Sequence, residues 1–158
     1  MNEEGEVGAI PAERRKELLA RIPGFADLPS ALLEELAASL REEQYSAGRA
    51  VVTEGEIGDR LYLIERGCAG ATTAGPTGPI LLAMLESGDL FGEIALLDTA
   101  RRRHATVKAL TALVTLSLSA AAFAKALAAF PEARLDLATT AEALLTAKYL
   151  KKKSLRTP

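Results

Sequence analysis

The chain has 158 residues, of which 49% are hydrophobic and 25% charged, so it is predicted to form one globular domain, and a disordered or collagen-like chain is excluded. Its 19 basic and 21 acidic residues give a net charge of −2, which provides no global attraction to nucleic acid or to an anionic membrane. The single cysteine, Cys68, and the single histidine, His104, exclude an internal disulfide and a metal site built from several thiolates or imidazoles.

The first forty residues are predicted to be helical. Acidic residues stand at the N-terminus, where a secretory signal needs a basic region and an apolar run, so we expect a cytoplasmic protein. Pro11 begins one helical pattern, which Pro23 and Gly24 end, and Ser30 is predicted to cap a second helix. The apolar residues on one face of this second helix are Leu32, Leu33, Leu36, Ala37 and Leu40.

The middle of the chain, from Tyr45 to Leu118, is predicted to form β structure. Glycines interrupt it at short intervals, and the strand-like runs between them include residues 61–64, 80–85, 104–110 and 114–118. Many short strands within about 75 residues are typical of an antiparallel barrel or jelly roll.

The chain returns to a helical pattern after this β region. The uncharged stretch 109–124 is shorter than the ~20 apolar residues that a membrane-spanning helix needs, so we interpret it as a strand followed by a helix with Ser119 as its N-cap. Pro131 separates that helix from another with apolar residues at helical spacing up to Tyr149. The basic tail 148–156 is interpreted as a solvated helix end, with an anion- or membrane-binding arm as the alternative.

The clearest chemistry lies in the stretch FGEIALLDTARRRHATVKA, in which a short helix-compatible piece and three arginines interrupt the strands. Gly92 lets the backbone approach a ligand closely, and the first turn after it presents N–H groups around Ile94 and Ala95 that suit an anion. Arg103 can pair with the same phosphate, and Glu93 can accept hydrogen bonds from sugar hydroxyls. These groups predict a site for a phosphorylated sugar; the alternative is a solvated arginine turn beside a helix cap.

The same stretch resembles the phosphate-binding cassette of the cyclic nucleotide-binding domain, through the letters FGEIALL and RHATV. Catabolite activator proteins, regulatory subunits of cyclic-AMP-dependent kinase and cyclic-nucleotide-gated channels share this module. Three further stretches resemble the family's first helices, first hairpins and post-barrel helix: PGFADLPSALLEELAASL, AGRAVVTEGEIGDRLYLIERG and AAFAKALAAFPE. The resemblance covers residues 22–145.

The resemblance implies a mostly β fold with flanking helices (α+β). The β part would be an antiparallel β-roll or jelly roll, with N-terminal helices, a short cassette helix and C-terminal helices around it. We expect an N-terminal helical extension at 1–21, the cyclic nucleotide-binding β-roll with its flanking helices at 22–131, and a C-terminal helix with the basic tail at 132–158.

The resemblance also implies roles for individual residues. In that family the glycine backbone and the glutamate contact the ribose 2′-hydroxyl, the arginine pairs with the cyclic phosphate, and cassette amides complete the cradle. The chain departs from the family's pattern at Arg102, usually proline, and at position 104, where histidine favours neither cyclic AMP nor cyclic GMP. The predicted ligand-binding residues are Gly92, Glu93, Ile94, Ala95, Arg103, His104 and Ala105.

We therefore predict a sensor module for a cyclic purine nucleotide, with cyclic AMP slightly favoured over cyclic GMP and no metal or other cofactor. No nucleophile or carboxylate pair has a recognisable base partner, so we expect no enzyme. The residues after 131 are too few for a DNA-binding domain and no channel segment precedes the barrel, so we expect a stand-alone sensor or a fragment of one.

The predicted output is a repositioning of the C-terminal helices. The helix at 137–150 could cover the base, pair with its copy in a homodimer, or dock on a partner protein. The alternative function is a degenerate, nucleotide-free β-roll that serves as a docking or dimerisation module.

Overall fold

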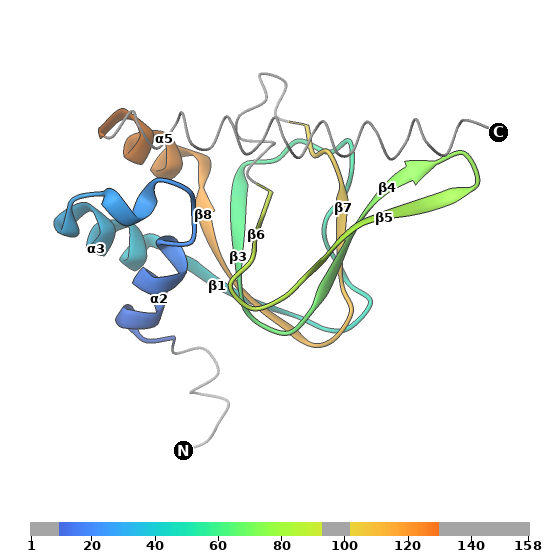
Figure 1. Ribbon diagram of the computed structural model, residues 1–158, viewed down its shortest axis with the longest axis horizontal. Coiled ribbons are helices and arrows are strands. Elements are labelled where there is room, and N and C mark those ends of the chain that lie inside the picture. The colour runs from blue at the N-terminus through green and yellow to red at the C-terminus, as the bar shows by residue number, and fades with distance from the viewer. Residues whose placement is uncertain (1–9, 93–101, 130–158) are drawn as a thin grey trace, which may run out of the picture.

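Two four-stranded antiparallel sheets form the centre of the protein in a computed structural model that describes residues 10–92 and 102–129 (Figure 1). The first sheet has the order β1 (Arg41–Tyr45), β8 (Leu113–Ser119), β3 (Arg60–Arg66) and β6 (Leu90–Phe91). The second has the order β2 (Ala50–Val52), β7 (Thr106–Ala109), β4 (Ala69–Gly75) and β5 (Gly78–Leu85). The predicted antiparallel β-roll is confirmed, although the strand predicted at 104–110 begins two residues later.

The helices lie on one side of the molecule, against the first sheet (Figure 1). They are α2 (Ala12–Leu19), the 3-10 helix η1 (Phe25–Asp27), α3 (Ser30–Ser39) and α5 (Ala120–Ala129). Within residues 10–92 and 102–129, none of the helices is long and apolar enough to cross a bilayer. The predicted cassette helix and the helix predicted after Pro131 lie outside the described residues.

The two predicted helix caps have different outcomes. Ser119 caps α5 as expected, because its Oγ accepts a hydrogen bond from the Ala122 amide at 3.1 Å. The prediction that Ser30 caps α3 is wrong, because Ser30 is already the first helical residue and Pro29 occupies the cap position. The carbonyl of Pro29 accepts the first helical hydrogen bonds, from the amides of Leu32 and Leu33 at 3.0 Å each, so α3 begins one residue earlier than predicted.

The first sheet separates two hydrophobic cores because successive residues of a strand point to opposite faces. From β3, Leu61 and Leu63 pack against the helices, whereas Tyr62 and Ile64 join the core between the sheets. The helix-side core also contains the stacked rings of Phe25 and Phe123, whose centroids are 6.1 Å apart. The strand β3 therefore contacts the helices with one face and the interior of the β-roll with the other.

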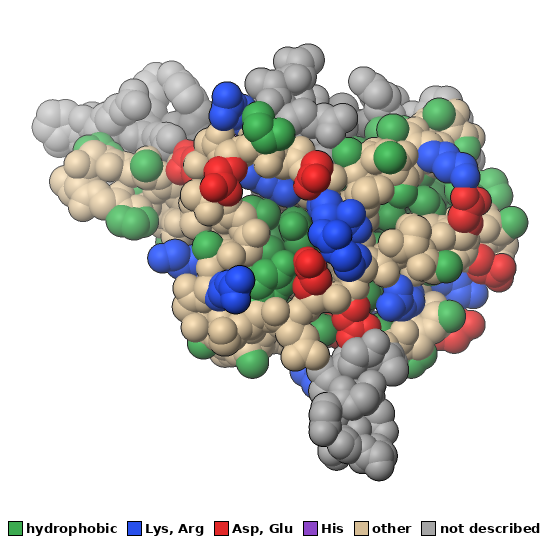
Figure 2. Space-filling view, turned by 180° about the vertical axis from the view of Figure 1, so that it is seen from behind, with side chains coloured by type: hydrophobic (Ala, Val, Ile, Leu, Met, Phe, Trp, Pro, Cys, Tyr) green, Lys and Arg blue, Asp and Glu red, His purple; other side chains and the backbone are tan. Residues whose placement is uncertain are grey.

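Charged contacts fasten the N-terminal helices to this framework. The Nε of Arg14 on α2 donates to Glu65 of β3 at 2.6 Å, and the Nη1 of Arg15 donates to the carbonyls of Ala37 and Leu40 at the end of α3. On the face shown in Figure 2, basic and acidic side chains are interspersed, as the small net charge of the chain leads one to expect. Ion pairs that water still reaches typically contribute ~0.2–1 kcal/mol each, so the two apolar cores provide most of the stability.

Substitution of two glycines with positive φ would test how closely the turns between strands pack against the rest of the protein. A Cβ built on Gly67 (φ 98°), between β3 and β4, would lie 2.2 Å from the carbonyl oxygen of Ala112, whereas one on Gly48 (φ 90°) meets nothing within 4 Å. Gly48→Ala should lower the free energy of unfolding by about 1–2 kcal/mol through backbone strain alone. Gly67→Ala adds a backbone clash and should cost about 1–3 kcal/mol more. Thermal unfolding should separate the two variants by roughly 2–12 °C, and equal melting temperatures would contradict this packing.

Candidate functional site

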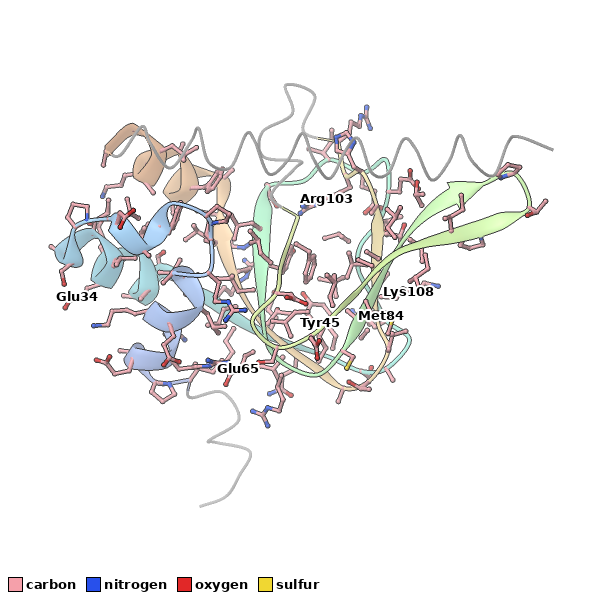
Figure 3. The ribbon with its side chains drawn as sticks, viewed as in Figure 1. Glu34, Tyr45, Glu65, Met84, Arg103 and Lys108 are labelled. Atoms are coloured by element: carbon pink, nitrogen blue, oxygen red, sulfur yellow. The ribbon has the colours of Figure 1, made fainter. Side chains whose placement is uncertain are left out.

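The side chain of Arg103 is buried between the two sheets, with only 6% of its surface exposed. Its Nη1 donates to the carbonyl of Gly92 at 3.0 Å, and its Nη2 donates to the carbonyl of Arg60 at 2.9 Å. Figure 3 shows Arg103 at one end of the sandwich and Tyr45 towards the other end. The guanidinium thus joins three segments: the residues before β7, the end of β6 and the start of β3.

An aromatic pair lies next to this guanidinium. The Cζ of Arg103 is 5.7 Å from the ring centroid of Tyr62, in the range of a cation–π contact. The ring of Tyr62 in turn stacks on Phe91, with centroids 5.0 Å apart and an angle of 7° between the planes. Because Phe91 directly precedes Gly92, the stack fixes the end of β6 next to the carbonyl that binds Arg103.

Gly92 is required by both conformation and space. Its φ of 87° is one that side chains rarely adopt, and a Cβ there would lie 2.8 Å from Nη1 of Arg103 and 3.4 Å from Cδ1 of Tyr62. The sequence predicted a close approach of the backbone to a ligand at this glycine. In the structure the main chain at Gly92 directly contacts the arginine that was predicted to hold the ligand's phosphate.

The main chain of Arg103 is held by the loop between β2 and β3, residues 53–59. The amide of Gly55 donates to the carbonyl of Arg103 at 2.9 Å, and the amide of Arg103 donates to the carbonyl of Glu56 at 2.7 Å. The neighbouring Arg102 donates from Nη1 to the carbonyl of Gly55 at 2.7 Å and forms an isolated antiparallel bridge with Ile57. Both the backbone and the tip of the Arg103 side chain are therefore hydrogen-bonded to other segments.

A second guanidinium, that of Arg60, also lies in this polar part of the sandwich. Its Nε donates to Oγ of Ser117 at 2.7 Å and its Nη2 to the carbonyl of Ser117 at 3.0 Å. Burial lowers the pKa of Arg60 below its ordinary value, and the positive charge of Arg41 lowers it further. Burial raises the pKa of Tyr62 above the ordinary 10.0, and the charge of Arg103 opposes that rise. Two arginines at this end of the sandwich favour an anionic ligand.

The structure describes only part of the predicted ligand-binding set. Gly92 and Arg103 are in direct contact, and His104 and Ala105 form a half-buried bend between Arg103 and β7. The strand-like run predicted at 104–110 directly follows Arg103, but β7 begins only at Thr106, three residues after the arginine. The predicted residues outside the described part of the chain are Glu93, Ile94 and Ala95. The described residues contain no group of three or more His, Cys, Asp or Glu side chains that could hold a metal ion.

Sequence reasoning did not identify three features of this site. They are the carbonyl of Arg60, the ring of Tyr62 and the main-chain contacts of the loop 53–59. The run EGEIGD was noted as part of the family resemblance, and its glycines indicate a turn. Nothing in the run indicates that this turn lies against Arg103, more than forty residues away, because the contact depends on how β2 pairs with β7.

Comparison with protein families gives a match to the model described as "Cyclic nucleotide-binding domain" over residues 42–130. A cAMP-dependent protein kinase regulatory subunit of Yarrowia lipolytica is 41% identical over 109 residues, which cover 69% of this chain and 28% of that protein. A cyclic nucleotide-gated potassium channel of Rhizobium etli is 38% identical over 110 residues, covering 70% of this chain and 29% of the channel. The chain therefore spans less than a third of the length of these relatives.

Among solved structures, cAMP-bound PfPKA-R superposes on this chain with a TM-score of 0.69 at 27% sequence identity. The superposition covers 80% of this chain and 43% of the solved chain. The likeness extends beyond the region matched by the family model to the arrangement of most of the chain.

The tyrosine beside Arg103 should make stability depend on alkaline pH. Because the pKa of Tyr62 is raised in the folded protein, the unfolded tyrosine loses its proton first as the pH rises through 10.0. The unfolded state is then favoured, and the free energy of unfolding should fall by up to ~1.4 kcal/mol per pH unit from this group. Tyr62→Phe keeps the ring and removes the proton, so urea unfolding between about pH 9 and 11 should show a shallower decline. A decline as steep as in the wild type would contradict the assignment.

Proposed function

The chain belongs to the cyclic nucleotide-binding domain family, and from that premise we propose that it is a sensor that binds a cyclic purine nucleotide beside Arg103. The observation that carries the proposal is the buried guanidinium of Arg103, held in place at the end of the sandwich where Gly92 leaves β6. We propose that the protein acts by binding alone, as a cytoplasmic module without catalytic activity.

The proposed binding mode follows from charge and desolvation. A cyclic phosphate carries one negative charge, which would pair with Arg103 and with main-chain amides around Ile94 and Ala95. Glu93 would accept hydrogen bonds from the ribose hydroxyl. Because Arg103 is buried and already ordered by the protein, little side-chain entropy remains to be lost when the phosphate pairs with it.

Cyclic AMP is the proposed ligand, ahead of cyclic GMP. The support comes from the relatives, since the Yarrowia protein is a regulatory subunit of a cAMP-dependent kinase and PfPKA-R was solved with cAMP bound. His104 favours neither nucleotide, so residue 104 does not distinguish the two ligands.

The proposed response is a shift of the helices that follow the β-roll. Helix α5 is joined to the N-terminal helices by the stacking of Phe123 on Phe25 and by an ion pair between Lys125 and Glu35 of α3. A ligand that favours one position of α5 would therefore also act on α3. We propose that the segment 132–158 passes this change to a second copy of the chain or to another protein.

One observation favours a second function, a docking or dimerisation module that binds no nucleotide. Both Nη atoms of Arg103 already donate to carbonyls of the protein's own chain, at Gly92 and Arg60. A guanidinium held in this way can serve as a structural link between strands. Titration with nucleotide separates the two functions, because only the sensor releases or absorbs heat at millimolar ligand.

The arginine itself provides the decisive test of ligand binding. Arg103→Ala removes a buried ionic partner and should cost ~2–5 kcal/mol, or roughly 30- to 4000-fold in affinity for cyclic AMP, measured by isothermal titration calorimetry. Arg66→Ala, which removes an exposed arginine from the end of β3, should leave the affinity unchanged and controls for the loss of one positive charge. Unchanged affinity in Arg103→Ala, or no heat from the wild type with either nucleotide, would refute the proposed function.

A further inference from the structure

The carboxylate of Glu54, directly after β2 and its first loop residue, is bound to the neighbouring strand β4. Its Oε2 accepts a hydrogen bond from the hydroxyl of Thr73 at 2.7 Å, and its Oε1 accepts one from the amide of Ala74 at 2.9 Å. Thr73 is 1% exposed, so the contact with the hydroxyl is shielded from water. Hydrogen bonds to an ionised carboxylate are roughly twice as strong as neutral ones, and here both oxygens of one side chain bind adjacent residues of β4.

The main chain around Glu54 leads directly to Arg103. The amide of Glu54 donates to Oγ1 of Thr106, the first residue of β7, at 2.9 Å. The next amide, that of Gly55, donates to the carbonyl of Arg103, and the carbonyl of Glu56 accepts from the Arg103 amide. A single peptide unit therefore separates the residue that binds β4 from the residues that hold Arg103.

Gly55 makes this arrangement possible. Its φ is 90°, and a Cβ built on it would meet nothing within 4 Å, so conformation alone requires glycine here. The left-handed turn at Gly55 lets the loop leave β2 and lie against Arg103 while the carboxylate of Glu54 remains on β4. Released from β4, this loop would lose the two contacts that join the Glu54 side chain to that strand, and the glycine at position 55 restrains the backbone less than any other residue would.

We propose that Glu54 is a positioning residue for Arg103, fixing the loop 53–59 to β4 and thereby fixing the main chain of the arginine. The inference rests on the proposed function, in which Arg103 pairs with the phosphate of the nucleotide. The tip of Arg103 is held by the carbonyls of Gly92 and Arg60, and its main chain is held through Glu54. Because both the main chain and the tip of Arg103 are held, the guanidinium keeps one geometry before the ligand binds. Without the Glu54 carboxylate, part of the binding free energy would be spent on ordering the loop 53–59.

The test compares Glu54→Ala with Glu54→Gln and with Glu56→Ala. Glu54→Gln keeps an oxygen for the Ala74 amide and an NH₂ that can donate to the Thr73 hydroxyl, so it should restore the geometry that Glu54→Ala loses. Glu56→Ala removes an exposed carboxylate from the same loop and keeps the main-chain carbonyl that binds the Arg103 amide, so it controls for the change in charge near an anionic ligand.

Two measurements are made on each variant. In the ligand-free protein, hydrogen exchange of the Arg103 and Gly55 amides should accelerate in Glu54→Ala and stay at the wild-type rate in Glu54→Gln and Glu56→Ala. Calorimetry with cyclic AMP should show affinity roughly 5- to 150-fold weaker in Glu54→Ala, the range of typical coupling between sites, with no comparable loss in the two other variants. In an Arg103→Ala background, adding Glu54→Ala should change the affinity no further.

The outcomes separate this inference from the proposed function. If wild-type protein binds no nucleotide, the proposed function fails, and exchange at the Arg103 amide alone decides whether Glu54 holds that segment. Unchanged exchange at Arg103 in Glu54→Ala overturns the inference, as does equal affinity of Glu54→Ala and wild type for cyclic AMP. If Glu54→Ala does not fold, Thr73→Val removes one of the two contacts with the carboxylate and should produce the same two changes in smaller measure.

Discussion

A permanent positive charge buried inside a β-sandwich is the constraint on which the arrangement of this site depends. Leaving a guanidinium unpaired away from water costs several kcal/mol, so Arg103 must have partners. The protein supplies the carbonyls of Gly92 and Arg60 and the ring face of Tyr62. These carbonyls and the ring satisfy hydrogen bonds of the guanidinium, and the monoanionic phosphate of the proposed ligand would bring a charge of opposite sign to it. The same charge therefore organises the described part of the site and favours an anionic ligand.

Strand β3 links that site to the helices. Its residues alternate between Tyr62 and Ile64, which face the core between the sheets, and Leu61 and Leu63, which pack against α2, α3 and α5. Packed cores resist small displacements, so a change in the position of Tyr62 under Arg103 affects the helix-side contacts of the neighbouring leucines. The carbonyl of Arg60, at the start of the same strand, is also a direct partner of Arg103.

Patterns within short stretches of sequence predicted the elements well, and contacts between distant stretches were not predictable. Of the eight strands in the described residues, alternation and glycine spacing predicted β3, β5, β7 and β8, and Ser119 was correctly predicted to cap α5. The cap of α3 was predicted one residue too late, at Ser30. Pro29 occupies the cap position, where a residue without an N–H is tolerated. Gly92 and Arg103 were both singled out, by glycine chemistry, by charge and by family resemblance. Their mutual contact and the role of the loop 53–59 depend on strand register, which no local pattern specifies.

The loop 53–59 is connected to more than Arg103. Its last residue, Asp59, accepts a hydrogen bond from the amide of Ala120 at 2.8 Å, at the point where β8 becomes α5. One short loop thus contacts β4 through Glu54, the Arg103 main chain through Gly55, and the start of α5 through Asp59. A loop fixed at all three places makes the site rigid, which favours tight binding of a ligand. A conformational response to the ligand requires, in addition, an element that can adopt two alternative positions. The main-chain bond between the Ala120 amide and the Asp59 carbonyl connects this loop to the start of α5, and it is the contact through which the proposed response to ligand would reach that helix.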